Sequence, residues 1–126
     1  MKDREEIIMN YLDGYNSFDI DKMVKDLDDH LLFENISKGI VTDSLNGKEA
    51  FKEQAEQAKS FFSDRNQKVT SITHFKDYSE VSIDYVATLA IDFPNGPNKG
   101  DKINLQGKSI FEFNKKGKLI TIKDIS

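Results

Sequence analysis

The hydrophobic pattern of this chain changes its period near Arg65. Before that residue, apolar side chains recur at intervals of three and four positions, as they do on one face of an amphipathic helix. After it, apolar and polar residues alternate, most clearly from Val81 to Phe93, as expected for a strand with one buried face. Helices followed by hairpin-connected strands predict an α+β fold, with three N-terminal helices on one face of a mainly antiparallel sheet.

The first helix is expected from about Asp3 to Phe18. Asp3 and Glu6 have the spacing of a capping box, and apolar residues follow at helical intervals. Gly14 lies inside this helix, where a glycine costs about 1 kcal/mol relative to alanine. We therefore expect another part of the chain to pack closely against Gly14.

A short second helix is expected after Asp19, whose side chain can cap it. Its apolar residues extend to Leu27, and the Asp-Asp-His run at 28–30 is expected to end it. The elements predicted next are a strand from Leu31 to Ser37, a loop over residues 38–45 with a short strand near Ile40 and Val41, and a third helix that is capped by Asn46 and stops near Ser63 and Asp64. The predicted strands of the second half are Lys68–Lys76, Val81–Phe93, Lys102–Phe113 and Leu119–Ile125.

The composition limits the classes of function. With 126 residues, the chain has the size of a single domain, 1–126. Its 18 basic residues are spread among 22 acidic ones, so there is no broad positive surface for nucleic acid. No apolar run approaches the roughly 20 residues of a membrane span, so no membrane contact is expected. The absence of cysteine suits a reducing compartment, and we expect a cytoplasmic protein.

The usual motifs of cofactor and metal sites are missing from the sequence. The two histidines, His30 and His74, are far apart and form no helical pair. There is no glycine-rich phosphate loop, and no serine lies in a nucleophile elbow. We therefore expect neither a cofactor nor a metal ion.

Three local patterns, YLDGYNSFDIDKMV, DDHLLFEN and FEFNKKGKLITIKD, accompany this order of elements. Together they resemble the nuclear transport factor 2-like superfamily, which includes the SnoaL-like polyketide cyclases and ketosteroid isomerase. The resemblance covers nearly the whole chain. It implies a cone-shaped fold in which a strongly curved sheet wraps around the helices and encloses an apolar pocket for a small organic molecule.

The resemblance can be followed residue by residue against ketosteroid isomerase, where an aspartate is the general base and a tyrosine and a protonated aspartate form the oxyanion hole. It places Tyr11 at the tyrosine, Asn35 at the base and Ser109 at the protonated aspartate. An amide cannot take a proton from a carbon acid at neutral pH, and serine is a weaker donor than a neutral carboxylic acid. Steroid isomerisation is therefore not expected.

SnoaL-like cyclases commonly carry a polar residue, often an aspartate, on the last strand, within a pattern of glycine, lysine, an aliphatic residue and a later Trp-Asp pair. Gly117-Lys118-Leu119 resembles the opening of that pattern, and Asp124 matches its aspartate, although Lys123 stands in place of the tryptophan. The resemblance thus makes Asp124 the candidate acid or base.

Alternation along the last strand supports an inward position for Asp124. It turns Ile120 and Ile122 inward with Asp124, and it leaves Thr121 and Lys123 to solvent. A carboxylate inside an apolar pocket has a raised pKa suited to proton transfer. The alternative is a solvated carboxylate near the C-terminus.

Several other side chains are candidates for the pocket, each with a structural alternative. Tyr11 either donates its hydroxyl to a ligand oxygen or is simply a core aromatic residue. Asn35 and Ser109 can bind a ligand carbonyl or each other. The further candidates for ligand contact are Tyr15, Phe33, Tyr85, Phe111 and Ile122.

Two functions remain open from the sequence. The first is cofactor-free isomerase, cyclase or dehydratase chemistry on a small apolar molecule, with Asp124 as proton acceptor and Tyr11 as donor to the oxyanion. The second is a non-catalytic module of the same fold that binds a ligand or a protein. We also expect a homodimer through the outer sheet face, whose flat centre contains Val86, Thr88 and Ala90, with Ile110 as a further candidate.

Overall fold

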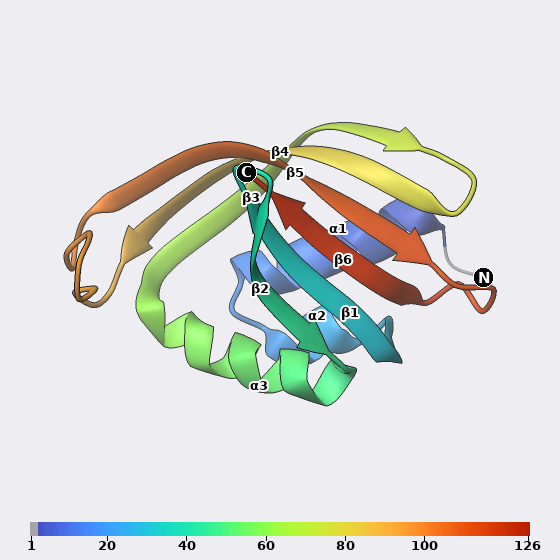
Figure 1. The fold of residues 1–126 in the computed structure, drawn as a ribbon, viewed down its shortest axis with the longest axis horizontal. Helices are drawn as coiled ribbons and strands as arrows, with labels where there is room; N and C mark the ends of the chain where they lie inside the picture. The colour runs from blue at the N-terminus through green and yellow to red at the C-terminus, as the bar shows by residue number, and fades with distance from the viewer. Residues whose placement is uncertain (1–2) are drawn as a thin grey trace.

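The computed structural model of the chain describes residues 3–126 and has three helices packed on a curved, six-stranded sheet (Figure 1). The strands lie in the order β2-β1-β6-β5-β4-β3, and all neighbours are antiparallel except β1 and β6. This confirms the predicted α+β class. The elements are α1 (Arg4–Asn16), α2 (Ile20–Val24), β1 (Leu27–Ser37), β2 (Ile40–Asn46), α3 (Lys48–Ala58), β3 (Phe62–His74), β4 (Tyr78–Leu89), β5 (Lys102–Phe113) and β6 (Leu119–Ile125).

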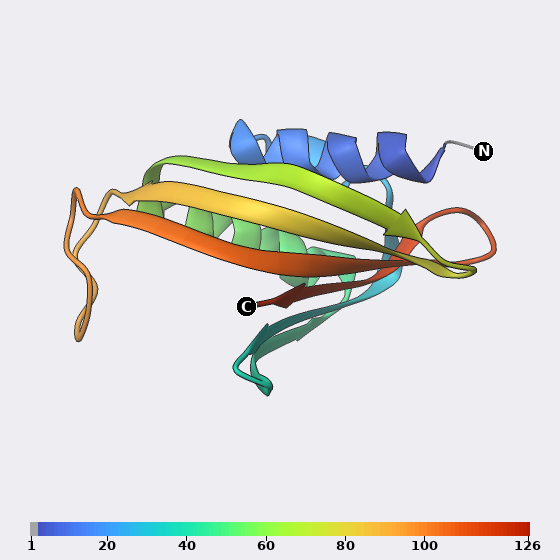
Figure 2. The same cartoon turned by 90° about the horizontal axis from the view of Figure 1, so that it is seen from above.

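Helix α1 runs along one face of the sheet, beside β3, and α3 packs against β1 and β2 (Figure 2). The side chains of α1 that are buried recur at the helical spacing seen in the sequence, and they are Ile7, Ile8, Tyr11 and Leu12. They pack on the inner face of the strands, where Val81 and Phe111 are fully buried. Within the described residues, no helix is long and apolar enough to cross a membrane.

The close packing expected at Gly14 is present. A Cβ atom at this position would lie 2.8 Å from the backbone nitrogen of Met23, so only glycine lets α2 approach α1 this closely. The predicted cap of α2 is also confirmed, because the Asp19 carboxylate accepts a hydrogen bond of 3.1 Å from the backbone nitrogen of Lys22.

Helix α2 is shorter than predicted, since it ends at Val24 and β1 already begins at Leu27. Leu27 pairs with Leu119 of β6, and His30 lies within β1 instead of ending a helix. The apolar spacing of Leu27 fits a helix, but pairing with a distant strand decided its conformation, as tertiary contacts often do.

Residues 38–45, predicted mainly as a loop, form most of the edge strand β2. Lys38 and Gly39 both have positive φ angles, 52° and 80°, and turn the chain directly back along β1. The third helix begins after Gly47 instead of Asn46, and it ends at Ala58. A short 3-10 turn then leads into β3, which begins at Phe62, earlier than predicted, because residues 62–68 pair with the far end of β4.

The long alternation of β4 ends at Leu89, not at Phe93. Beyond it the chain enters the projecting loop between β4 and β5 (Figure 1), where Phe93 packs against Phe61 with ring centroids 5.8 Å apart. The prediction for β6 was also wrong at two positions. A bulge around Ile120 places Leu119 in the core instead, and Thr121 is buried although it was expected to face solvent.

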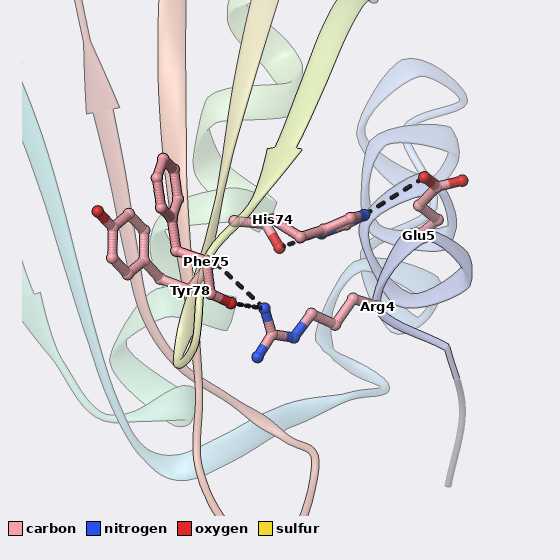
Figure 3. A network of polar contacts seen from close by, with 6 residues as sticks. Arg4, Glu5, His74, Phe75 and Tyr78 are labelled. Atoms are coloured by element: carbon pink, nitrogen blue, oxygen red, sulfur yellow. Dashed lines mark hydrogen bonds and ion pairs between the residues drawn. The ribbon is translucent and has the colours of Figure 1, made fainter.

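A set of polar contacts ties the start of α1 to the hairpin between β3 and β4 (Figure 3). The guanidinium of Arg4 donates to three carbonyl oxygens at the tip of this hairpin, those of Phe75, Lys76 and Tyr78. His74 is exposed, and its Nε2 atom lies 3.3 Å from a carboxylate oxygen of Glu5. His74 therefore lies at the surface of the molecule, beside the start of α1.

Candidate functional site

A row of polar side chains crosses three adjacent strands at the C-terminal end of β6. Asn35 of β1 pairs with Asp124 of β6, and Asp124 pairs with Ser109 of β5. The hydroxyl of Ser109 donates a hydrogen bond of 2.7 Å to Oδ1 of Asp124. The Asn35 amide nitrogen donates to the hydroxyl of Thr42 at 2.9 Å. Three candidates that are distant in sequence therefore lie side by side.

Asp124 is the ionisable centre of this row. Burial raises the pKa of its carboxyl above the ordinary value of 3.8, because the charged form is poorly solvated there, and the Ser109 hydrogen bond lowers the pKa by a smaller amount. The neutral form is consequently favoured over a wider pH range than in an exposed aspartate. A carboxyl group of this kind can exchange a proton with a bound molecule.

Two cavities adjoin this row, and they share the lining residues Tyr15, Asn35 and Asp124. The first has a volume of about 230 Å³, and its walls include Ile83, Tyr85, Leu105, Gly107 and Ser109. The second has a volume of about 250 Å³, and its walls include Tyr11, Met23, Phe33, Phe51, Gln54, Ala55 and Arg65. Mostly apolar walls with a few polar groups are typical of sites for small organic molecules.

Tyr11 lines the second cavity and is 4% exposed. Its ring packs edge-on against Phe111, with centroids 5.8 Å apart, and also contacts Phe51. Burial raises the pKa of the Tyr11 hydroxyl well above its usual range, and the negative charge of Asp124 raises it further. The hydroxyl therefore stays protonated as a hydrogen-bond donor, close enough to Asp124 to be affected by its charge.

The hydroxyl groups of Tyr15 and Tyr85 are hydrogen-bonded to each other. Their hydroxyl oxygens are 2.8 Å apart and share a hydrogen bond between α1 and β4. Burial raises the pKa of both tyrosines, and the neighbouring Tyr85 adds to the rise at Tyr15. Both side chains line the first cavity, so this pair offers a neutral polar group beside Asp124.

The three remaining candidates lie at different depths. Phe33 lines the second cavity and packs against Phe51 with ring centroids 5.4 Å apart. Phe111 and Ile122 are both fully buried and line neither cavity. Their strand parity turns them inward among the core residues, beside Tyr11 in the case of Phe111.

Two polar features of the second cavity were not anticipated from the sequence. Asp43 of β2 accepts a hydrogen bond of 2.6 Å from the amide of Gln54 in α3. Arg65 of β3 is 5% exposed and is among the lining residues. Arg65 shares the inward parity of the half-buried Val69, and this was the only local signal that it faces the interior. Within residues 3–126, no group of three or more histidine, aspartate or glutamate side chains is arranged to hold a metal ion.

Comparison with known proteins identifies the fold. No protein-family model matches the sequence, and no curated protein matches it either. Solved structures do match: a proposed polyketide cyclase from Xanthomonas campestris has a TM-score of 0.82 at 13% identity, over 97% of this chain and 88% of its own. An NTF2-like protein of unknown function from Exiguobacterium has a TM-score of 0.73 at 15% identity, over 94% of this chain and 95% of its own. The chain has the nuclear transport factor 2-like fold.

Solved structures of this fold are described with different activities. An LEH-like epoxide hydrolase from M. tuberculosis matches with a TM-score of 0.75 at 13% identity, over 95% of this chain and 79% of its own. At such identities the likeness shows the fold alone, and activity depends on the side chains of each site.

In this nuclear transport factor 2-like fold, Asn35, Asp124 and Ser109 lie next to one another on three adjacent strands. The two positions that the resemblance to ketosteroid isomerase assigns to aspartates, 35 and 109, flank Asp124 on either side. The row therefore has a carboxyl group at its centre and neutral hydrogen-bonding groups at both sides.

Proposed function

We propose that this chain binds a small, mostly apolar organic molecule at the two cavities and transfers a proton through Asp124. The observation that carries the proposal is the placement of Asp124, which lines both cavities and whose pKa is raised by burial. A half-buried carboxyl group with a raised pKa, at the wall of an apolar pocket, is suited to acid/base chemistry and needs no cofactor for it.

In the reaction, Asp124 would accept a proton from a carbon or oxygen atom of the substrate. The Ser109 hydroxyl donates a hydrogen bond to Oδ1 of Asp124 and so holds the carboxyl group in one orientation. The other carboxyl oxygen, Oδ2, receives no hydrogen bond from Ser109. Tyr11 would donate its hydroxyl to the substrate oxygen on which negative charge develops. Isomerisation, cyclisation and dehydration each have a form that begins with such a proton transfer, whereas steroid isomerisation through a base at position 35 does not fit, since Asn35 cannot serve as the base.

The walls would orient the substrate. Tyr15 and Tyr85 would present their shared hydroxyl pair, and Phe33 would offer an aromatic face. We propose that Asn35 and Ser109 are the neutral polar contacts of the ligand. Phe111 and Ile122 would act from the core, by supporting Tyr11 and the row that contains Asp124.

Native mass spectrometry of the freshly purified protein tests the binding function, because a tightly held ligand would appear as a mass added to the folded chain. A thermal-shift screen across steroids, polyketides and fatty acids follows. For any substrate found, Asp124→Asn should abolish turnover, whereas Asp64→Asn, the same change at an exposed position, should not. Unchanged turnover in Asp124→Asn would rule out the assigned base.

A non-catalytic binding module is the second candidate. It is favoured by Asn35 and Ser109, which are neutral at two positions where the resemblance to an isomerase expects carboxylates. This function predicts a ligand that is bound and recovered unchanged, with an affinity that Asp124→Asn alters only modestly.

We further propose that two copies associate through the outer sheet face. Val86 is 45% exposed on this face, and half-buried Thr88, Ala90 and Ile110 are the other apolar or small residues that the alternation assigns to it. Light scattering at micromolar concentration should give the mass of a dimer, and Val86→Lys should give a monomer. A monomeric unmodified protein would refute the proposal.

A further inference from the structure

Arg65 is a buried cation whose hydrogen bonds are incomplete. Its side chain is largely enclosed, with the residue 5% exposed, and its Nε atom donates to the backbone oxygen of Tyr15 at 2.8 Å. Its Nη2 atom is buried and has no hydrogen-bond partner among the described residues. In the same part of the chain, no aspartate or glutamate forms a salt bridge with it.

Aromatic rings compensate only part of this charge. The guanidinium carbon lies 3.8 Å from the ring centroid of Tyr15 and 4.5 Å from that of Phe18. Such contacts contribute about 0.5–2 kcal/mol each. An unpaired buried charge is far more costly than that, so a counter-charge at this place would be strongly favoured.

A purely structural role accounts for one end of the side chain. The bond from Nε to Tyr15 fastens the end of α1 to β3, next to a reciprocal pair of hydrogen bonds between Asn16 and Gln67. This role needs only the Nε atom. It does not explain why the guanidinium lines the second cavity, or why its charge lowers the pKa of the Tyr11, Tyr15 and Tyr85 hydroxyls.

Within the described residues, neither of the two acidic side chains that line the second cavity, Asp124 and Asp43, forms a salt bridge with Arg65. Arg65 is on β3 and Asp124 is on β6, with β4 and β5 between them in the sheet. Three strand spacings correspond to about 14 Å along the sheet. Asp124 is already hydrogen-bonded to Ser109, and half-buried Asp43 is hydrogen-bonded to Gln54. Arg65 is thus a charged group of this cavity that has no salt bridge among the described residues and whose buried Nη2 atom has no hydrogen-bond partner there.

We propose that the molecule bound at this pocket is a small organic acid, and that Arg65 receives its carboxylate while its apolar body lies against Phe33 and Phe51. The inference rests on the proposed small-molecule function and adds the chemical class of the ligand. A guanidinium is suited to this role, because its planar array of N–H groups matches the two oxygens of a carboxylate.

Matched pairs of probes test the inference on the unmodified protein. Benzoate is compared with benzamide, and hexanoate with hexanamide, by titration calorimetry at neutral pH, so that each pair differs in charge and hardly in shape. We expect each acid to bind at least tenfold more tightly than its amide. Amides that bind as tightly as the acids would overturn the role of Arg65 and leave the small-molecule pocket standing. Binding of neither class would overturn both proposals.

Two variants then locate the effect. Arg65→Gln should bring the ratio of acid to amide affinity close to one. Lys68→Gln removes the same charge from an exposed position of the same strand and should leave the ratio unchanged. A preference for acids that survives in a folded Arg65→Gln protein would refute the assignment. If this variant does not fold, Arg65→Lys is the second test: it retains the charge without the planar fork, so the acids should still bind more tightly, by a smaller ratio.

Discussion

Replacing Asp124 by asparagine tests how far folding raises the pKa of the carboxyl group at the centre of the polar row. Asparagine has nearly the same shape, and its side-chain oxygen can still accept the 2.7 Å hydrogen bond from Ser109. It cannot ionise. Any dependence on pH of the stability difference between the two proteins therefore reports the ionisation of Asp124.

The direction follows from the raised pKa. Below pH 3.8, the ordinary value of the group, both the folded and the unfolded protein hold the proton, and the stabilisation by the neutral carboxyl is fully present. As the pH rises from there, the unfolded chain loses the proton while the folded protein keeps it. The free energy of unfolding of the unmodified protein then falls by up to about 1.4 kcal/mol per pH unit, until the folded-state pKa is passed. The asparagine variant is free of this loss.

The measurement is urea unfolding followed by circular dichroism, at closely spaced pH values between 3.5 and 8. The free energy of unfolding of Asp124→Asn minus that of the unmodified protein should rise with pH and then reach a plateau, and the start of the plateau gives the folded-state pKa. Ser109→Ala removes a hydrogen bond that lowers this pKa, so in that variant the stability should keep falling to a higher pH. A difference that stays flat, or one that rises towards acid pH, would show that the carboxyl group is not shielded from water.

Three further changes test the packing around the site. Gly14→Ala places a Cβ atom 2.8 Å from the nitrogen of Met23 and should lower the free energy of unfolding by about 1–3 kcal/mol in urea, whereas Gly96→Ala, in open space, should change it by less than about 0.5 kcal/mol. Arg4→Ala should cost about 1–2 kcal/mol and accelerate amide hydrogen exchange at the tip of the hairpin between β3 and β4; unaltered exchange there would contradict the role of its three hydrogen bonds. Tyr15→Phe and Tyr85→Phe should each cost about 1 kcal/mol, and their double mutant should cost clearly less than the sum, because one shared hydrogen bond is lost in all three; simple additivity would argue against that bond.

The helical half of the fold was predictable to the extent that it depends on neighbouring residues. The stripe of apolar residues in α1, the cap at Asp19 and the close approach at Gly14 are all properties of short segments, and all are found in the structure. The end of α2 and the strand β2 were missed. Their conformations depend on pairing with β6 and β1, and such pairing overrides a weak local preference.

The candidate site was likewise predictable only in those features that depend on neighbouring residues. Alternation from Ile122 to Asp124 was enough to turn Asp124 inward, because the side-chain period of a strand is a local property, whereas the bulge around Ile120 broke the alternation earlier in the same strand. The neighbours of Asp124 were not predictable in this way, since Asn35 and Ser109 come beside it only through the parallel register of β1 with β6 and the antiparallel register of β5 with β6.

The sequence by itself determined the α+β order of elements, the apolar inner faces and the presence of an inward carboxyl group, because these follow from side-chain periodicity. Only the tertiary structure decided which polar groups meet at the cavities. Arg65 is the clearest case, since its burial depends on the end of α1 and on the rings of Tyr15 and Phe18, which lie some fifty residues away in the chain. Contacts of that kind depend on how the sheet curves and on strand register, neither of which is written in any short segment.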